Sequence, residues 1–149
     1  MDWRLKSFPG GKDFSLQSNQ SLTHPGGTYY FQNFTMQGGS SLMFTGPATI
    51  YCYGTFNVGG NTMTSGSKPG NLTIVMCKTP GGTAPGSLTV GSSAALYASI
   101  YAPQSAVTLS GSGDIYGTVL GLTVDLTGTS GIHFDLSLNS QNGTISLVQ

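Results

Sequence analysis

The sequence contains no glutamate and few charged residues of any kind. Only 7% of its 149 residues are charged, and the five Lys and Arg balance the five Asp. Soluble domains usually carry about 25% charged residues. Proteins that bind nucleic acids need clustered basic side chains, so we expect no nucleic-acid partner.

Cysteine and long apolar runs are scarce as well. Cys52 and Cys77 are the only cysteines, too few for a disulfide-dense scaffold, and no histidine cluster lies near them to form a metal site. No apolar run approaches the ~20 residues of a membrane span, and residues 1–8 lack the hydrophobic region of a signal peptide. We expect no metal, no cofactor and no membrane-spanning segment.

Glycine and hydroxyl-bearing residues, in contrast, are abundant. The chain has 23 Gly beside many Ser and Thr, and few strong helix formers. Hydrophobic residues make up 38% of the chain and include seven Tyr and seven Phe, too many for a disordered linker. Because the length fits one domain, the composition predicts a single all-β domain.

Two sets of short segments alternate along the chain. In the first set an apolar–polar–apolar triplet is followed closely by Gly, at 34–38, 56–59, 88–91, 107–111 and 124–128. In the second set Ile follows a small or polar residue, at 49–51, 73–75, 99–101, 114–116 and 131–133. Strands this short bury a face only when successive copies stack and share one core. We therefore predict a right-handed, single-stranded parallel β-helix, or solenoid, over residues 28–138.

The stacked repeats are expected to align into ladders. The predicted inward ladders are Ile50, Ile74, Ile100, Ile115 and Ile132, and Met36, Val58, Val90, Leu109 and Leu126. The predicted outward ladders are a polar one of Thr35, Asn57, Thr89, Thr108 and Asp125, and an aromatic one of Tyr51, Tyr101, Tyr116 and His133. The aromatic ladder is a candidate ligand-binding surface. The alternative is ordinary strand chemistry, because aromatic and β-branched residues favour sheet surfaces in any case.

Both ends of the chain depart from the repeats. Half of the charged residues lie in the first thirteen positions, and we expect residues 1–27 to form an N-terminal arm or cap. In this arm Phe14 and Leu16 alternate with polar residues, as in an edge strand. Asn142-Gly143 is a strong hairpin signal, so we expect residues 139–149 to form a C-terminal strand or hairpin.

Five motifs follow one another in a recognisable order. They are PGGTYYF at 25–31, GPATIY at 46–51, GNLTI at 70–74, YAPQSAVTLSG at 101–111 and IHFD at 132–135. This order resembles the β-helical C-terminal domain of bacterial envelope proteins associated with pilus assembly. In repeat style the chain is also similar to bactofilins, which polymerise end to end. The resemblance implies a structural or surface role, extracellular or in the cell envelope, and carries over no catalytic motif.

The carboxylates do not form an obvious catalytic group. β-Helices that cleave acidic polysaccharides need clustered carboxylates and a cation that meets the substrate. Beyond the arm the only carboxylates are those of Asp114, Asp125 and Asp135, about half a coil apart, and no Lys or Arg follows Lys78. Asp114 and Asp135 remain a candidate pair on one flank. The sequence nevertheless predicts a protein that is not an enzyme.

Two functional hypotheses remain. The first is head-to-tail self-assembly into a filament or surface scaffold, because both ends of a solenoid expose strand edges and a nearly uncharged surface promotes association. The residues expected at the contact are Trp3, Leu5, Phe8, Phe14, Leu16, Ile145 and Leu147. An arm that caps its own chain is the alternative. The second hypothesis is a glycan-binding module that grips a surface polysaccharide through the tyrosine ladder.

Overall fold

The structure, a computed structural model, describes residues 12–59, 62–64, 66, 68–79, 81–91 and 93–134. Twelve strands form one sheet, and every strand pairing in it is parallel. The strands are β1 (Lys12–Leu16), β2 (Ser21–His24), β3 (Gly27–Met36), β4 (Ser41–Phe44), β5 (Ala48–Cys52), β6 (Phe56–Val58), β7 (Thr62–Thr64), β8 (Leu72–Met76), β9 (Leu88–Val90), β10 (Ala95–Leu109), β11 (Asp114–Leu126) and β12 (Gly131–His133). Within the described residues the only helical element is the 3-10 turn η2 (Pro69–Asn71).

Each coil of the chain passes over three faces, which we name A, B and C. Face A holds β1, the second half of β3, β6, β9 and the last parts of β10 and β11. Face B holds β2, β4, β7, the first parts of β10 and β11, and β12. Face C holds the first half of β3, β5, β8 and the middle parts of β10 and β11.

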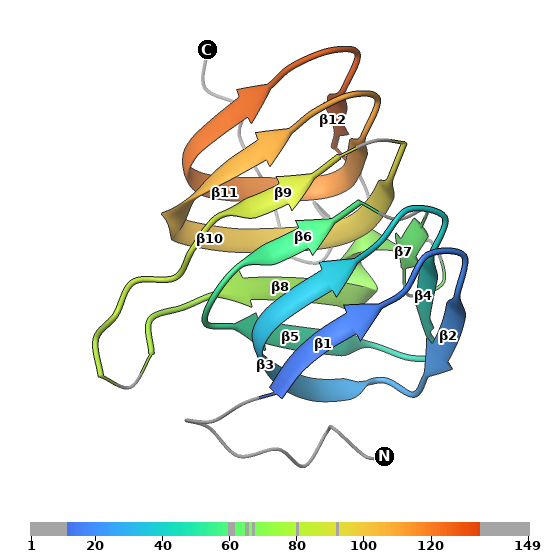
Figure 1. The fold of residues 1–149 in the computed structure, drawn as a ribbon, viewed down its shortest axis with the longest axis horizontal. Coiled ribbons are helices and arrows are strands. Elements are labelled where there is room, and N and C mark those ends of the chain that lie inside the picture. The colour runs from blue at the N-terminus through green and yellow to red at the C-terminus, as the bar shows by residue number, and fades with distance from the viewer. Residues whose placement is uncertain are drawn as a thin grey trace.

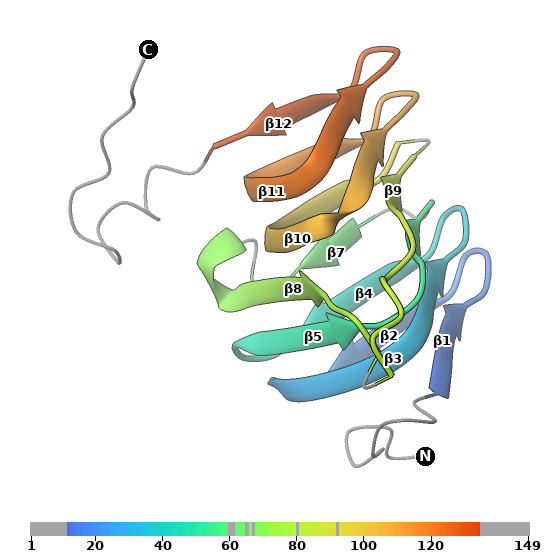
Figure 2. The same cartoon turned by 90° about the vertical axis from the view of Figure 1, so that its left-hand side faces the viewer.

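The coils stack into a solenoid that rises from the N-terminal to the C-terminal end. From β1 the chain passes through β2 to β3 and winds upward in a right-handed sense (Figures 1 and 2). This is the sense expected of parallel crossovers. The predicted right-handed parallel β-helix is confirmed.

The inward ladder on face A has the predicted register. Met36, Val58, Val90, Leu109 and Leu126 pair in that order, and Leu16 precedes Met36 in the same ladder. The outward neighbours Thr35, Asn57, Thr89, Thr108 and Asp125 align as predicted too. Burial alternates along most of the strands, as in the buried–exposed–buried pattern of β6, because side chains alternate sides with the two-residue period of a strand.

The predicted isoleucine ladder is wrong in its second half. Ile50, Ile74 and Ile100 do align on face C, but Ile100 then pairs with Val119. Ile115 lies on face B between Leu96 and Ile132. A full coil here takes 19 residues, from Ala95 to its partner Asp114. The triplets at 99–101 and 114–116 are closer together than one coil, so they fall on different faces.

Tight turns between faces A and B use left-handed backbone. Gly39, Gly111 and Gly128 have φ of 76°, 66° and 71°, and Asn19 takes the equivalent place in the first coil with φ of 62°. Glycine adopts this conformation without steric cost, and Asn tolerates it better than most residues. Gly111 and Gly128, which follow their face A triplets, therefore end those strands at a corner as predicted, whereas in the second coil the left-handed residue is Gly39 and not Gly38.

The corner between faces C and A is held by a side-chain ladder. The Asn33 backbone N–H and side-chain amide both donate to Asp13 Oδ1, at 3.2 and 3.0 Å. Asn33 Oδ1 in turn accepts from the backbone N–H of Thr55 at 2.9 Å and from its hydroxyl at 3.2 Å. These bonds link three successive coils. They also satisfy the backbone N–H groups of Asn33 and Thr55, which the bend at this corner removes from the hydrogen bonds between strands.

The first coil corrects the predicted N-terminal boundary. β1 pairs with β3 and β2 pairs with β4, so the solenoid includes Lys12–His24 and the arm does not extend to residue 27. The strand predicted around Phe14 and Leu16 is β1, but it belongs to the solenoid of its own chain. The predicted C-terminal hairpin at 139–149 lies outside the described residues.

Candidate functional site

The aromatic side chains form two separate ladders. On face B, Tyr97 stacks on Tyr116 with ring centroids 4.7 Å apart, and Tyr116 stacks on His133 at 4.6 Å. On face C, Tyr30 stacks on Tyr51 at 5.2 Å. The single ladder predicted from the sequence is therefore wrong. Tyr51 and Tyr101 belong to face C, whereas Tyr116 and His133 belong to face B.

Sequence reasoning missed Tyr30 and Tyr97. Both are outward residues in strands that continue across a corner, Tyr30 in β3 and Tyr97 in β10. Tyr30 follows Tyr29 and Tyr97 follows Leu96, so neither belongs to a triplet with Ile at its centre. The signal that could have found them is the same triplet with another large apolar residue in place of Ile. Thr28-Tyr29-Tyr30 corresponds to Thr49-Ile50-Tyr51, and Ala95-Leu96-Tyr97 corresponds to Asp114-Ile115-Tyr116.

The carboxylates lie on different faces. Asp114 begins β11 on face B, and Asp125 points outward from face A. Asp114 Oδ1 lies 3.5 Å from His133 Nε2, so it pairs across one coil with the end of the aromatic ladder. Asp135, its proposed partner, lies outside the described residues. No group of three metal-binding side chains occurs in the described part of the chain.

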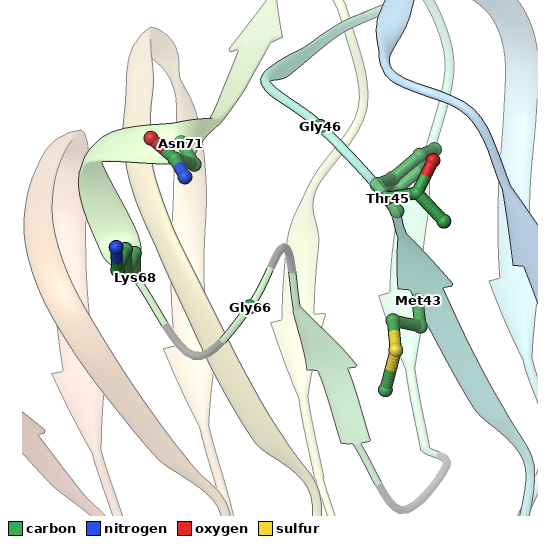
Figure 3. A pocket seen from close by; sticks show the side chains of 7 residues that line it. Met43, Thr45, Gly46, Gly66, Lys68 and Asn71 are labelled. Atoms are coloured by element: carbon green, nitrogen blue, oxygen red, sulfur yellow. The ribbon is translucent and has the colours of Figure 1, made fainter.

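A hollow of about 510 Å³ opens between the end of β4 and the approach to η2. Met43, Thr45 and Gly46 lie on one side of it, and Lys68 and Asn71 on the other (Figure 3). Lys68 is the only charged residue among those that line it. The hollow therefore offers no acid–base pair among its described lining residues.

Both cysteines are free thiols. Cys52 is fully buried, and its Sγ lies 3.5 Å from the Gln32 carbonyl and 3.4 Å from the Thr55 carbonyl. Burial raises the pKa of Cys52 to about 12 and also raises the pKa of Cys77. Because the thiolate is the reactive form of cysteine, neither environment activates a nucleophile.

The C-terminal coil leaves apolar side chains exposed. The apolar residues with large exposed areas there are Leu120, Leu122, Val124, Leu126 and Phe134. Val124 and Leu126 continue the inward ladders of face A beyond Val107 and Leu109, which are fully buried. We call Val124 and Leu126 the open end; the strand that carries them, β11, lies near the top of the solenoid in Figure 1.

The two apolar side chains of β1, at the N-terminal end of the solenoid, are buried within the same chain. Phe14 stacks on Phe34 at 4.6 Å, and Leu16 pairs with Met36. Both residues are less than a tenth exposed, so most of their surface packs within their own chain and not at the predicted contact with a second copy. Trp3, Leu5, Phe8, Ile145 and Leu147 lie outside the described residues.

Comparison with known proteins gives one family match. A family described as a domain of unknown function, DUF7305, matches residues 42–141, about two thirds of the chain. The chain belongs to the DUF7305 family. No curated protein and no solved structure shows significant similarity to it.

The DUF7305 match covers most of the surfaces described above. It begins within β4 and includes every strand from β5 to β12. The face B ladder and the open end therefore lie inside the family region, whereas β1, β2 and β3 precede it. None of the helices in the described part of this DUF7305 chain is long and apolar enough to cross a bilayer.

Proposed function

We propose that this protein is a non-enzymatic structural element that associates head to tail into a filament or scaffold, extracellular or in the cell envelope. The observation that carries the proposal is the open end. There the core ladders continue for one more step, but no described coil covers them: Leu126 is 47% exposed, although its ladder neighbour Leu109 is fully buried. Contiguous exposed apolar side chains of this kind mark association sites.

The first coil of a second copy is a suitable occupant. β1 begins the face A stack with Phe14, Ser15 and Leu16. A second copy that continues the stack would align these residues with Val124, Asp125 and Leu126 of β11. The outer edge of β1 would then pair with β11, and Ser15 would face Asp125. Phe14 and Leu16 are less than a tenth exposed, so they would add only their remaining surface to the contact. The contact joins two different ends, so it generates a filament unless its rotation closes a ring.

The alternative function, glycan binding through one continuous tyrosine ladder, has less geometric support than head-to-tail association. The four proposed members are divided between faces B and C. On face B the stacked rings of Tyr97, Tyr116 and His133 also cover one another's faces.

Sedimentation velocity of the full chain tests the proposal. We expect large, concentration-dependent assemblies for the wild type and their loss in Leu126→Lys, because a charge at the open end would be buried on association. Thr108→Lys is the matched control, since it adds the same charge on the outward side of face A. A wild-type chain that stays monomeric at high concentration would rule the proposal out.

A deletion of residues 1–11 tests the part assigned to Trp3, Leu5 and Phe8. The deletion leaves β1 and the rest of the first coil in place, so β-type circular dichroism should remain. If these three residues help to connect copies, filaments seen by electron microscopy should disappear. Filaments that persist unchanged after the deletion would show that residues 1–11 take no part in the contact between copies.

A further inference from the structure

The outer surface of face C carries two parallel rows of side chains. The first, which we call the hydroxyl row, contains Thr28, Thr49, Thr73, Ser99 and Thr118. The second, which we call the tyrosine row, contains Tyr30, Tyr51, Val75, Tyr101 and Leu120. Every member of both rows is at least partly exposed. Five strand segments therefore present a continuous stripe of hydroxyls beside a continuous aromatic and aliphatic stripe.

The spacing of the rows follows from the strand pairing. Neighbouring strands of a sheet lie about 4.8 Å apart, so a hydroxyl recurs at about that interval along the solenoid axis. Residues two apart in a strand point to the same side of the sheet. Each hydroxyl thus lies beside a member of the tyrosine row on the same strand, as Thr49 lies beside Tyr51.

Neither row contains a charged residue. The charged residues in the described part of the chain are Lys12, Asp13, Lys68, Lys78, Asp114 and Asp125. Lys68 and Lys78 lie outside β8, before and after it in the chain, and Asp114 and Asp125 belong to faces B and A. A charged polymer would find no oppositely charged side chain in the two rows of face C. The chemistry of face C therefore fits an uncharged partner.

Tyr101 is the most accessible aromatic ring on this face. Its side chain is 53% exposed, and its neighbours in the row are Val75 and Leu120. Within the described residues it stacks on no other ring, whereas Tyr30 and Tyr51 stack on each other. An unstacked tyrosine offers the apolar face of its ring together with a polar hydroxyl at the edge.

We propose that face C binds a neutral polysaccharide. The C–H face of a sugar ring packs on Tyr101 and its row, and the hydroxyls of the sugar exchange hydrogen bonds with the hydroxyl row. A second copy of the chain fits less well, because five hydroxyls buried against protein would each need a partner to offset the lost hydration. A polyhydroxylated ligand supplies those partners along its whole length.

Isothermal titration calorimetry of the full chain tests this proposal. The neutral probes are hydroxyethylcellulose, laminarin and a galactomannan, and polygalacturonate is the anionic probe. We expect binding to at least one neutral probe and none to polygalacturonate. Tyr101→Ala and Thr73→Val should each weaken binding at least about tenfold. Thr73→Val retains the β-branched shape and removes only the hydroxyl.

The control is Tyr116→Ala, which removes a ring from face B and should leave the affinity unchanged. Absence of binding to all three neutral probes would overturn the proposal. The proposal would also fail if Tyr101→Ala bound a neutral probe as tightly as the wild type, or if the chain bound polygalacturonate alone. A change in sedimentation of Tyr101→Ala without any polysaccharide would assign face C to contacts between copies instead. Head-to-tail association is tested at Leu126, so either proposal can fail without the other.

Discussion

Leu109 and Leu126 occupy the same position in adjacent coils, yet Leu109 is fully buried and Leu126 is 47% exposed. The two residues lie on the same face of the solenoid and have an identical side chain. They differ in that a described strand follows Leu109 on face A, whereas no described strand follows Leu126 there. The pair therefore separates the effect of burial within the solenoid from the effect of its open end.

We predict that Leu109→Ala and Leu126→Ala differ strongly in stability. Leu109→Ala leaves a cavity in the core and should lower the free energy of unfolding by about 2–5 kcal/mol. Leu126→Ala removes a largely solvated side chain and should cost less than about 1 kcal/mol when the chain is monomeric. Urea unfolding at a dilution that keeps the chain monomeric measures both values. Equal losses would mean that a further coil covers Leu126 within the same chain.

A second prediction concerns the two sides of β11. Ile115 is fully buried between Leu96 and Ile132, so Ile115→Asp places an unpaired charge in the core and should abolish soluble folding. Tyr116→Ser removes two ring stacks, with Tyr97 and His133, and should cost about 1–3 kcal/mol. Soluble expression and circular dichroism compare the two variants. If both variants lost soluble, folded protein to a similar extent, the assignment of Ile115 as inward and Tyr116 as outward would be wrong.

A third prediction concerns the corner between faces C and A. A Cβ on Gly54 would overlap Asn33 Oδ1 and the Gln32 carbonyl of the preceding coil. Gly54→Ala should therefore break the Asn33–Thr55 bonds and lower the melting temperature by several degrees in a domain of this size. Gly38→Ala is the matched control, because the nearest atom to its Cβ is the Gly59 carbonyl oxygen at 3.9 Å. A Gly54→Ala protein as stable as Gly38→Ala would show that the corner rearranges without cost.

The sequence predicts face A well because its strands are marked at the end. Three of its triplets are closely followed by a left-handed glycine, Gly39, Gly111 or Gly128, so the triplet and the turn together indicate the register of the strand. Faces B and C lack such a marker in the last coils. β10 and β11 run through their corners without a break, and Ser99-Ile100-Tyr101 resembles Asp114-Ile115-Tyr116 although the two lie on different faces.

The candidate surfaces depend on features that a local motif does not contain. Exposure at Leu126 depends on where the stack of coils ends, which is a property of the whole fold. The rows of face C depend on which residues of five segments share a register. Tyr30 and Tyr101, 71 positions apart in the sequence, belong to one row only because three intervening pairings bring them into line.

A fourth prediction concerns Cys52. Desolvation in the core raises the pKa of its thiol from 9.0 to about 12. The native chain should therefore react very slowly with iodoacetamide at Cys52 at neutral pH, and faster at the half-buried Cys77. Mass spectrometry after timed alkylation separates the two sites. Rapid modification of Cys52 in the folded chain would contradict its placement in the core.

The same pKa shift predicts how stability depends on pH. Below pH 9 the Cys52 thiol is protonated in both the folded and the unfolded chain, so it contributes no pH dependence. Between pH 9 and about 12 the unfolded chain loses this proton while the folded chain retains it, so the free energy of unfolding should fall by up to ~1.4 kcal/mol per pH unit. Tyr53, whose pKa burial also raises to about 12, adds a decline of the same sign. Cys52→Ala should flatten the profile by the cysteine's share alone, and an identical slope in Cys52→Ala and wild type would show that the thiolate is as well solvated in the folded chain as in the unfolded one.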